Sequence, residues 1–155
     1  MTKKDKIHVL SRAVIIDQEQ ILLCKLVGLF PVDFFVLPGG HVEIGESAEK
    51  ALIRELIEEA GCECKIERFL GCLEYSFEPL ANSFCHSHEY NFIFEASSEI
   101  LKADYKVPKL EPHVELIWVP LSELSKVDFR PTPLVDFIPK WLNSKANNIF
   151  SSEMI

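Results

Sequence analysis

The chain has 155 residues, of which 48% are hydrophobic and 26% are charged, and its formal net charge is -8 at pH 7. This length is typical of one folded domain with a sizeable core, and the composition is that of an ordinary globular protein. The net negative charge argues against a general nucleic-acid-binding protein, which carries a basic face. The sequence contains no run of about 18 apolar residues, so we expect no membrane span.

Two apolar stretches open the chain, residues 7–16 and residues 21–26, and they flank a polar run at residues 17–20. This pattern predicts a β-hairpin. The first stretch follows three lysines but is interrupted by polar side chains, so it is interpreted as a strand and not as the core of a signal peptide. A short apolar run at residues 34–37 predicts the next strand, which leads into a glycine turn at residues 38–40.

An amphipathic helix is predicted between Ser47 and Gly61. Ser47 is a favourable N-cap with an acidic residue in the turn that follows it, and Gly61 supplies a helix stop in a left-handed conformation. Apolar side chains recur on one flank of this helix, and we expect four of them to face the core, away from the acids: Leu52, Ile53, Leu56 and Ala60.

Three glutamates gather on another arc of the same helix. At about 100° per residue, Glu55, Glu58 and Glu59 fall within an arc of roughly 100°. Carboxylates this close repel one another, so the cluster suits a hard divalent cation, and Mg²⁺ and Mn²⁺ prefer carboxylate oxygen. A solvated acidic face is the commoner explanation for such a trio taken alone. The preceding glycine turn and the capped helix favour the metal site.

The segment at residues 40–62, GHVEIGESAEKALIRELIEEAGC, resembles the Nudix box of the Nudix hydrolases. The family pattern is Gly, five residues, Glu, seven residues, then Arg-Glu-aliphatic-any-Glu-Glu-any-Gly-aliphatic. The chain departs from it at Cys62, where an aliphatic residue is usual, and a buried thiol behaves as a small hydrophobe. The other fixed positions all match: Gly40, Glu46, Arg54, Glu55, Leu56, Glu58, Glu59 and Gly61.

The resemblance implies an α/β fold, a Nudix-type α-β-α sandwich with a mixed sheet and a catalytic loop-helix-loop. It also implies hydrolysis, dependent on Mg²⁺ or Mn²⁺, of the diphosphate bond in a nucleoside diphosphate linked to another moiety, including nucleoside triphosphates and ADP-ribose-like compounds. The expected partner is a small nucleotide-type substrate. We expect the domain to span residues 1–143 and residues 144–155 to form a flexible C-terminal tail.

The same resemblance and the acidic cluster together indicate the site residues. Glu59 is the firmest metal ligand, with a side chain expected to face solvent and the metal. Arg54 is expected to pair with a helix glutamate and fix its orientation, and Glu46 to tie the loop to the helix. The full set of expected metal ligands combines carboxylates with one backbone carbonyl: Glu55, Glu58, Glu59 and Gly39 or Gly40.

The general base in this family is either a box glutamate or an acid on a distant loop. Here the distant candidates are Glu111, in a proline-rich loop, and Glu115, which begins a predicted strand. Glu111 is favoured, because an acid on a strand serves a structural role equally well.

The rest of the chain predicts more strands and long loops. Long loops in compact domains are often functional, so residues 78–87 and 97–112 are where we expect substrate contacts. Aromatic residues such as Tyr105 are candidates to stack on a base, and Arg12 is a candidate phosphate contact, although each has an ordinary structural alternative. The remaining predicted elements are strands at residues 64–77, 89–96 and 115–119 and a final helix at residues 134–142, interrupted by Pro139.

The chain has five cysteines, an odd number without a Cys-x-x-Cys pair, which predicts free thiols in a reducing cytoplasm. Cys85, His86 and His88 offer an alternative zinc site. Two other function classes stay open. One is a Nudix-fold binding or regulatory domain without hydrolysis. The other is an isomerase of the isopentenyl-diphosphate type, with Cys24 or Cys85 as its site cysteine. The oligomeric state is also open, with a homodimer as one option.

Overall fold

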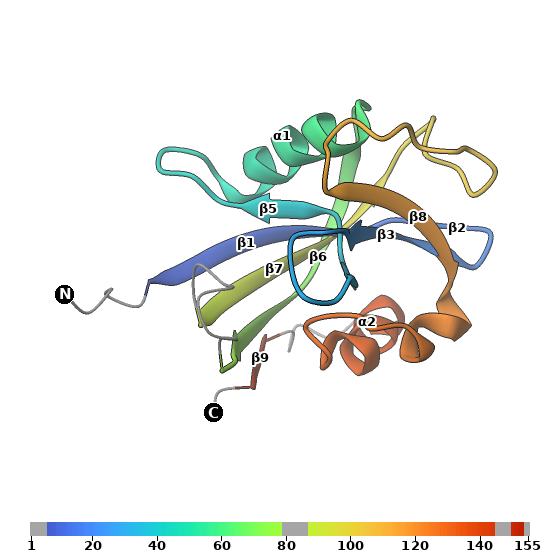
Figure 1. Ribbon diagram of the computed structural model, residues 1–155. Coiled ribbons are helices and arrows are strands. Elements are labelled where there is room, and N and C mark those ends of the chain that lie inside the picture. Colours follow the sequence, from blue (N-terminus) through green and yellow to red (C-terminus); the bar gives the residue numbers. More distant parts are fainter. Residues whose placement is uncertain (1–5, 79–86, 145–149, 154–155) are drawn as a thin grey trace.

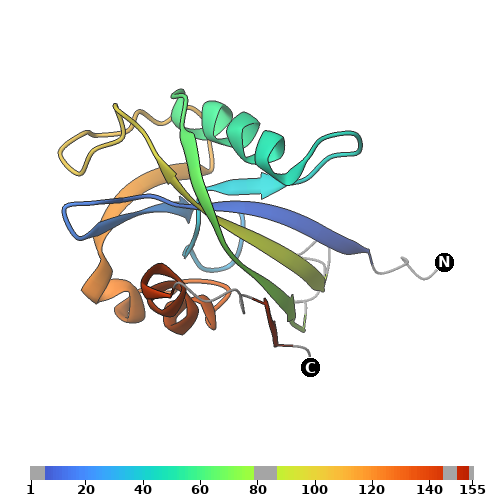
Figure 2. The same cartoon turned by 180° about the vertical axis from the view of Figure 1, so that it is seen from behind.

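The computed structural model describes residues 6–78, 87–144 and 150–153, and their strands form two sheets that lie between two helices (Figure 1). One helix, α1, covers one side of the sheets and the other, α2, covers the opposite side, as the view from behind also shows (Figure 2). The helices are α1 (Ala48–Ala60), the 3-10 helix η1 (Leu121–Lys126) and α2 (Leu134–Asn143).

The larger sheet is mixed. Strands β1 and β7 run parallel, as do β6 and β9, whereas β1 with β5 and β6 with β7 are antiparallel. The predicted α/β sandwich with a mixed sheet is therefore confirmed. The order across this sheet is β5 (Gly39–His41), β1 (Ile7–Val14), β7 (His88–Ser97), β6 (Lys65–Ser76) and β9 (Phe150–Glu153).

A second, antiparallel sheet is built around β3, which pairs with each of its neighbours. The predicted hairpin of residues 7–16 with 21–26 is correct only at its tip. Gln18 and Glu19 close that tip with positive φ angles of 48° and 60°, as a two-residue hairpin turn requires. Strand β1 pairs instead with β5 and β7 in the mixed sheet. The strands of the second sheet are β2 (Ile16–Asp17), β3 (Gln20–Leu26), β4 (Phe34–Val36) and β8 (Val114–Pro120).

Alternating side chains of the strands supply two hydrophobic cores, one under each helix. Leu22 on β3 belongs to the cluster that contains Leu52 and Leu56 of α1, whereas the next residue, Leu23, belongs to the cluster that contains Ile138 of α2. Successive side chains of a strand point to opposite faces of the sheet, so one strand contributes to both cores.

Helix α1 has the predicted ends. The Ser47 hydroxyl accepts a hydrogen bond from the backbone N–H of Lys50, and Gly61 is left-handed with φ of 68°. The predicted buried flank is wrong at one position, because Ile53 is 37% exposed. The buried arc is instead completed by Glu59, which lies roughly 20° from Leu52 around the helix.

The C-terminal part of the chain is more regular than the sequence predicts. Helix α2 continues through Pro139, since the buried Ile138 and Trp141 hold its last turns against the sheet although the proline removes one backbone hydrogen bond. Strand β9 pairs with β6 inside the segment predicted as a flexible tail. Among the described residues, no helix is long and apolar enough to cross a membrane.

Candidate metal and catalytic site

The segment between β4 and α1, which begins with strand β5, needs glycine at two positions because other groups approach its backbone closely. Gly39 has φ of 131°, and a Cβ atom there would lie 2.1 Å from the carbonyl oxygen of Ser11 on β1. A Cβ atom on Gly40 would lie 2.5 Å from the carboxylate of Glu55. The two glycines therefore let this segment lie against β1 and let the Glu55 carboxylate lie against the segment.

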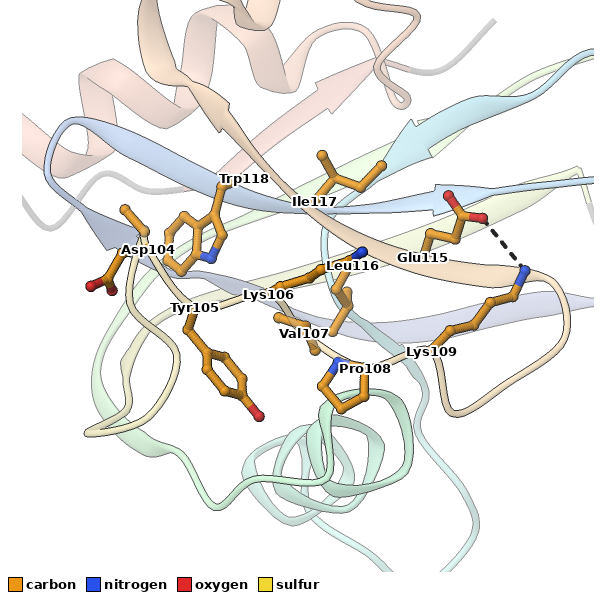
Figure 3. A pocket seen from close by; sticks show the side chains of 11 residues that line it. Asp104, Tyr105, Lys106, Val107, Pro108, Lys109, Glu115, Leu116, Ile117 and Trp118 are labelled. Carbon is orange, nitrogen blue, oxygen red and sulfur yellow. Dashed lines mark hydrogen bonds and ion pairs between the residues drawn. The ribbon is translucent and has the colours of Figure 1, made fainter.

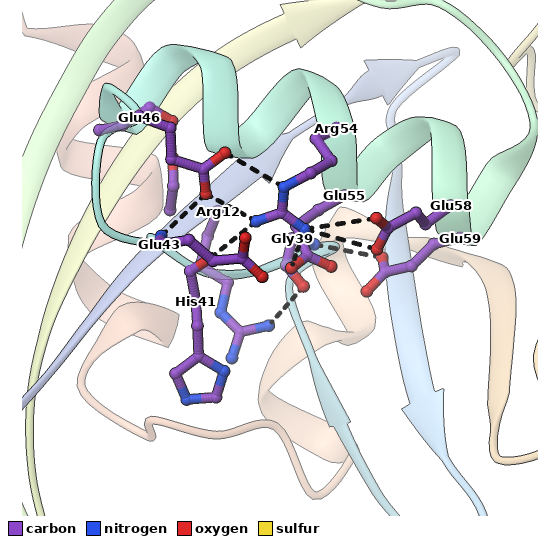
Figure 4. Close-up of polar contacts among 11 residues, drawn as sticks. Arg12, Gly39, His41, Glu43, Glu46, Arg54, Glu55, Glu58 and Glu59 are labelled. Atoms are coloured by element: carbon purple, nitrogen blue, oxygen red, sulfur yellow. Dashed lines mark hydrogen bonds and ion pairs between the residues drawn. The ribbon is translucent and has the colours of Figure 1, made fainter.

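Arg54 connects this segment to the helix and lies at the centre of Figure 4. Its guanidinium donates to both carboxylate oxygens of Glu46, at 2.7 and 3.1 Å, and to the carbonyl oxygen of His41 at 3.0 Å. It also donates to Glu55 at 3.0 Å and to Glu58 at 3.4 Å. The predicted pairing of Arg54 with helix glutamates is thus present in the structure.

Glu46 joins the two ends of the loop-helix segment, as the sequence predicts. Besides its bidentate pair with Arg54, it accepts a hydrogen bond at 2.8 Å from the backbone N–H of Glu43. The hydrogen bonds from Arg54 hold the pKa of the Glu46 carboxyl below its usual value. Glu46 is therefore ionised at neutral pH and orients Arg54, which in turn holds the box glutamates.

The three box glutamates lie in different environments. The Glu58 side chain is 48% exposed and that of Glu55 is 17% exposed, whereas Glu59 as a residue is only 8% exposed. The prediction that the Glu59 side chain faces solvent is therefore wrong. Glu59 points inward and accepts a hydrogen bond at 3.2 Å from the backbone N–H of Gly39.

Burial is the main cause that raises the pKa of Glu59 to about 8. The negative charges of Glu55 and Glu111 act in the same direction, and Arg12 and the Gly39 N–H oppose them. Burial also raises the pKa of Glu55, although the hydrogen bond from Arg54 opposes this. A carboxylate pair that is desolvated in this way is stabilised in its ionised form by a nearby cation.

Arg12 is a residue of this site that the sequence offers only as a candidate phosphate contact. Its Nη1 atom donates to the carbonyl oxygens of Leu37 at 2.9 Å and Gly39 at 3.4 Å, and its charge acts on Glu59. An arginine in the middle of an apolar strand is the signal in the sequence that points to such a buried role.

The structure separates the two distant acids. Glu111 lies close enough to Glu59 for its charge to raise the pKa of that buried carboxyl. Glu115 instead lies 3.5 Å from the ammonium of Lys109, in an ion pair at the start of β8. The loop before β8 thus brings Glu111, and not Glu115, to the acidic face of α1.

The oxygen atoms of the box glutamates and of the backbone at Gly40 are of the chemical type that binds a hard divalent cation. The described residues contain no group of three or more His, Cys, Asp or Glu side chains already converged to hold a metal ion, and Arg54 and the Gly39 N–H occupy oxygen atoms of the glutamates through hydrogen bonds. The available ligands are oxygen atoms, two of the carboxylates are desolvated, and the missing side chain at Gly40 lets the Glu55 carboxylate lie close to the backbone there.

The cysteine alternatives have less support. Cys24 is 1% exposed, and burial raises the pKa of its thiol to about 12, so it carries almost no thiolate at neutral pH. Cys85 and His86 of the alternative zinc site lie outside the described residues, and Nε2 of His88 lies 3.5 Å from a carboxylate oxygen of Glu74. The described cysteines are free thiols: Cys24, Cys62, Cys64 and Cys72.

Comparison with known proteins identifies the family. The model of the NUDIX domain matches residues 7–142. The chain belongs to the NUDIX family. This NUDIX domain is 32% identical over 109 residues to an ADP-ribose pyrophosphatase of Methanocaldococcus jannaschii, a match that covers 70% of this chain and 59% of the relative. The chain spans between 33% and 59% of the length of the curated relatives it matches.

Solved structures show the same fold. A NUDIX hydrolase from Nitrosomonas europaea superposes with a TM-score of 0.68 at 24% identity, covering 88% of this chain and 89% of that one. A MutT NUDIX hydrolase from Burkholderia pseudomallei superposes with a TM-score of 0.64 at 25% identity, covering 86% and 99% of the two chains. The family and the fold predicted from residues 40–62 are confirmed.

Proposed function

We propose that this protein hydrolyses the diphosphate bond of a nucleoside diphosphate linked to another moiety, with Mg²⁺ as its metal and Mn²⁺ able to replace it. The observation that carries the proposal is the acidic face of α1, where Glu55 and Glu59 lie against Gly39 and Gly40 of β5 and Arg54 orients the box side chains by hydrogen bonds. The relative from Methanocaldococcus jannaschii, an ADP-ribose pyrophosphatase, supports this substrate class.

The residues that would hold the metal are Glu55, Glu58, Glu59 and the carbonyl group of Gly40. A divalent cation bound there would offset phosphate charge and lower the pKa of a water molecule. Arg54 keeps two of these carboxylates in place through hydrogen bonds, and the Gly39 N–H orients the third. Without those donors the acidic side chains would spread apart by charge repulsion.

Glu111 is the proposed general base. Its loop places it near the buried Glu59 but leaves it partly exposed, so water can reach its carboxylate. In this role Glu111 accepts the proton of the attacking water as the water's oxygen bonds to one phosphorus, while the bridging P–O bond breaks and the second phosphate-bearing product leaves with the bridging oxygen. Glu115 is the weaker candidate, because Lys109 already neutralises it.

Two of the alternatives make different predictions. A binding or regulatory domain would turn nothing over, and an isomerase would release no phosphate-bearing fragment. The unreactive environment of Cys24 argues against the isomerase. The Arg54 network and the desolvated acids argue against a domain that only binds, since they suit metal chemistry. The cytoplasmic location, the homodimer and the limits of the domain at residues 1–143 stay predictions.

The test is a hydrolysis screen with Mg²⁺ that compares the wild type with Glu59→Gln. The panel contains nucleoside triphosphates, ADP-ribose, nucleotide sugars and dinucleoside polyphosphates. We expect the variant to lose turnover by about 100-fold or more while remaining folded, because the amide keeps the side chain's shape without its charge. Glu63→Gln is the matched control, since Glu63 is exposed just after the helix. A fully active Glu59→Gln enzyme contradicts the site.

A further inference from the structure

A pocket that the proposed metal site does not use lies between strand β8 and the loop that precedes it (Figure 3). Its volume of about 870 Å³ is in the range of small-molecule sites. One wall comes from the loop that contains Tyr105 and Lys106, and the other from residues of β8 that include Trp118. The pocket is therefore large enough for a nucleoside.

Among the side chains that line the pocket, Trp118 has a buried hydrogen-bond donor without an acceptor. Nε1 of Trp118 is buried and makes no hydrogen bond, and Figure 3 shows the nitrogen edge of the indole turned toward the loop residues across the pocket. Buried indole N–H groups ordinarily have a partner. Nε1 has no surface accessible to water, so an acceptor reaches it only with a small shift of the indole or of the loop.

The remaining side chains indicate what kind of group fits. Tyr105 is half-buried and offers a second aromatic ring beside the pocket (Figure 3). At one end Lys109 and Glu115 neutralise each other. In the described part of the chain, Asp104 and Lys106 form no hydrogen bond or ion pair through their side chains. Two aromatic rings, a donor and little net charge suit a planar heteroaromatic ring with a carbonyl or ring-nitrogen acceptor.

The pocket is lined by the same loop that contains the proposed general base. Glu111, whose charge acts on Glu59, follows Lys109 by two residues in the same loop. A ligand whose ring occupies the pocket would therefore contact the loop that also carries Glu111.

We propose that this pocket binds the nucleobase of the substrate, with the Trp118 indole N–H donating to the base and Tyr105 stacking against it; this inference rests on the proposed function. In this proposal, the loop before β8 recognises the nucleobase of the substrate. The same loop then carries both the base contact and Glu111.

The test observes the two tryptophan indole N–H resonances by NMR, in protein labelled with ¹⁵N and stripped of metal by a chelator. Trp118→Phe assigns the two signals. Trp141, on α2, is an internal control that lies in the other core. We expect AMP, GMP or CMP to shift the Trp118 signal saturably and leave the Trp141 signal in place, and ribose 5-phosphate, which lacks a base, to shift neither.

Unchanged Trp118 signals with every nucleotide at millimolar concentration, or an equal shift with ribose 5-phosphate, would overturn the proposal. Because no metal is present, the result is independent of hydrolysis. Turnover without an indole shift contradicts the pocket alone, whereas a shift in a protein that cleaves no diphosphate supports the pocket and contradicts the proposed hydrolysis.

A kinetic variant gives a second measurement. We expect Tyr105→Ala to raise KM for the best nucleotide substrate roughly tenfold with little change in kcat, because stacking is lost and the acidic face is untouched. Lys102→Ala is the control, since Lys102 is exposed in the same loop outside the pocket. An unchanged KM in a variant that melts normally would overturn the stacking role.

Discussion

The two helices pack on opposite sides of the same pair of sheets but use their buried faces differently. Helix α2 buries Leu134, Ile138 and Trp141, all apolar or aromatic. Helix α1 buries Leu52 and Leu56 together with a carboxylate, Glu59. The buried face of α2 is therefore wholly apolar or aromatic, whereas α1 gives one core position to an acid whose burial is unfavourable unless something neutralises it.

The largest expected effect comes from replacing that acid with an apolar residue. Glu59→Leu should lower turnover by about 100-fold or more, because the proposed metal loses a ligand. In a chelator at pH 8.5 it should also raise the free energy of unfolding, since no charge remains buried. Turnover and urea unfolding measure the two effects. A variant that is both active and less stable than the wild type would contradict the proposal that α1 buries Glu59 for catalysis at a cost in stability.

A substitution on the buried face of α2 should have the opposite pair of effects, a loss of stability with little change in turnover. Ile138→Ala should lower the free energy of unfolding by about 2–5 kcal/mol, because Ile138 is fully buried, while kcat at a temperature where the protein is folded stays near wild type. Ile53→Ala on α1 is the control and should cost much less, because that side chain is 37% exposed. A loss of kcat in folded Ile138→Ala protein would show that α2 also serves the site.

The pH dependence of stability sharpens the comparison. The pKa of Glu59 rises from 4.5 to about 8 on folding, so between these pH values the folded state binds the proton that the unfolded state has lost. Metal-free protein should then lose on the order of a few kcal/mol of stability as the pH rises from 4.5 to 8. Chemical unfolding in a chelator measures this slope.

Two controls identify the origin of that slope. Glu59→Gln should make it shallower, and saturating Mg²⁺ should restore stability at pH 8 if the metal binds the ionised carboxylate. An unchanged slope in the variant would mean that another group is responsible.

The smallest expected effect concerns the arginine that orients the acids. Arg54→Lys keeps the charge but cannot make the bidentate pair with Glu46 while also reaching Glu55. We expect kcat to fall by roughly 10-fold to 100-fold with little change in melting temperature. Arg68→Lys, which changes an arginine of β6 that forms an ion pair with Glu95, is the control. Equal activity of Arg54→Lys and Arg68→Lys would contradict the proposal that Arg54 orients the acids.

Helix α1 and its ends could be predicted from the sequence because the interactions that determine them join neighbouring residues. The caps at Ser47 and Gly61 and the length of α1 follow from hydrogen bonds between residues a few positions apart. The spacing of the acids in residues 40–62 likewise predicts the family, which the matching domain confirms. The sequence alone thus determined the family, the helix and the cluster of acids.

Tertiary structure decided how that cluster is used. Whether Glu59 faces water or the core depends on which flank of α1 meets the sheet. That sheet is itself assembled from strands distant in sequence, because β1 pairs with β5 and β7. The approach of Glu111 to Glu59 and the pocket beside Trp118 likewise depend on the path of a long loop. Periodicity reports which residues share a face, but contacts between distant segments determine what that face meets.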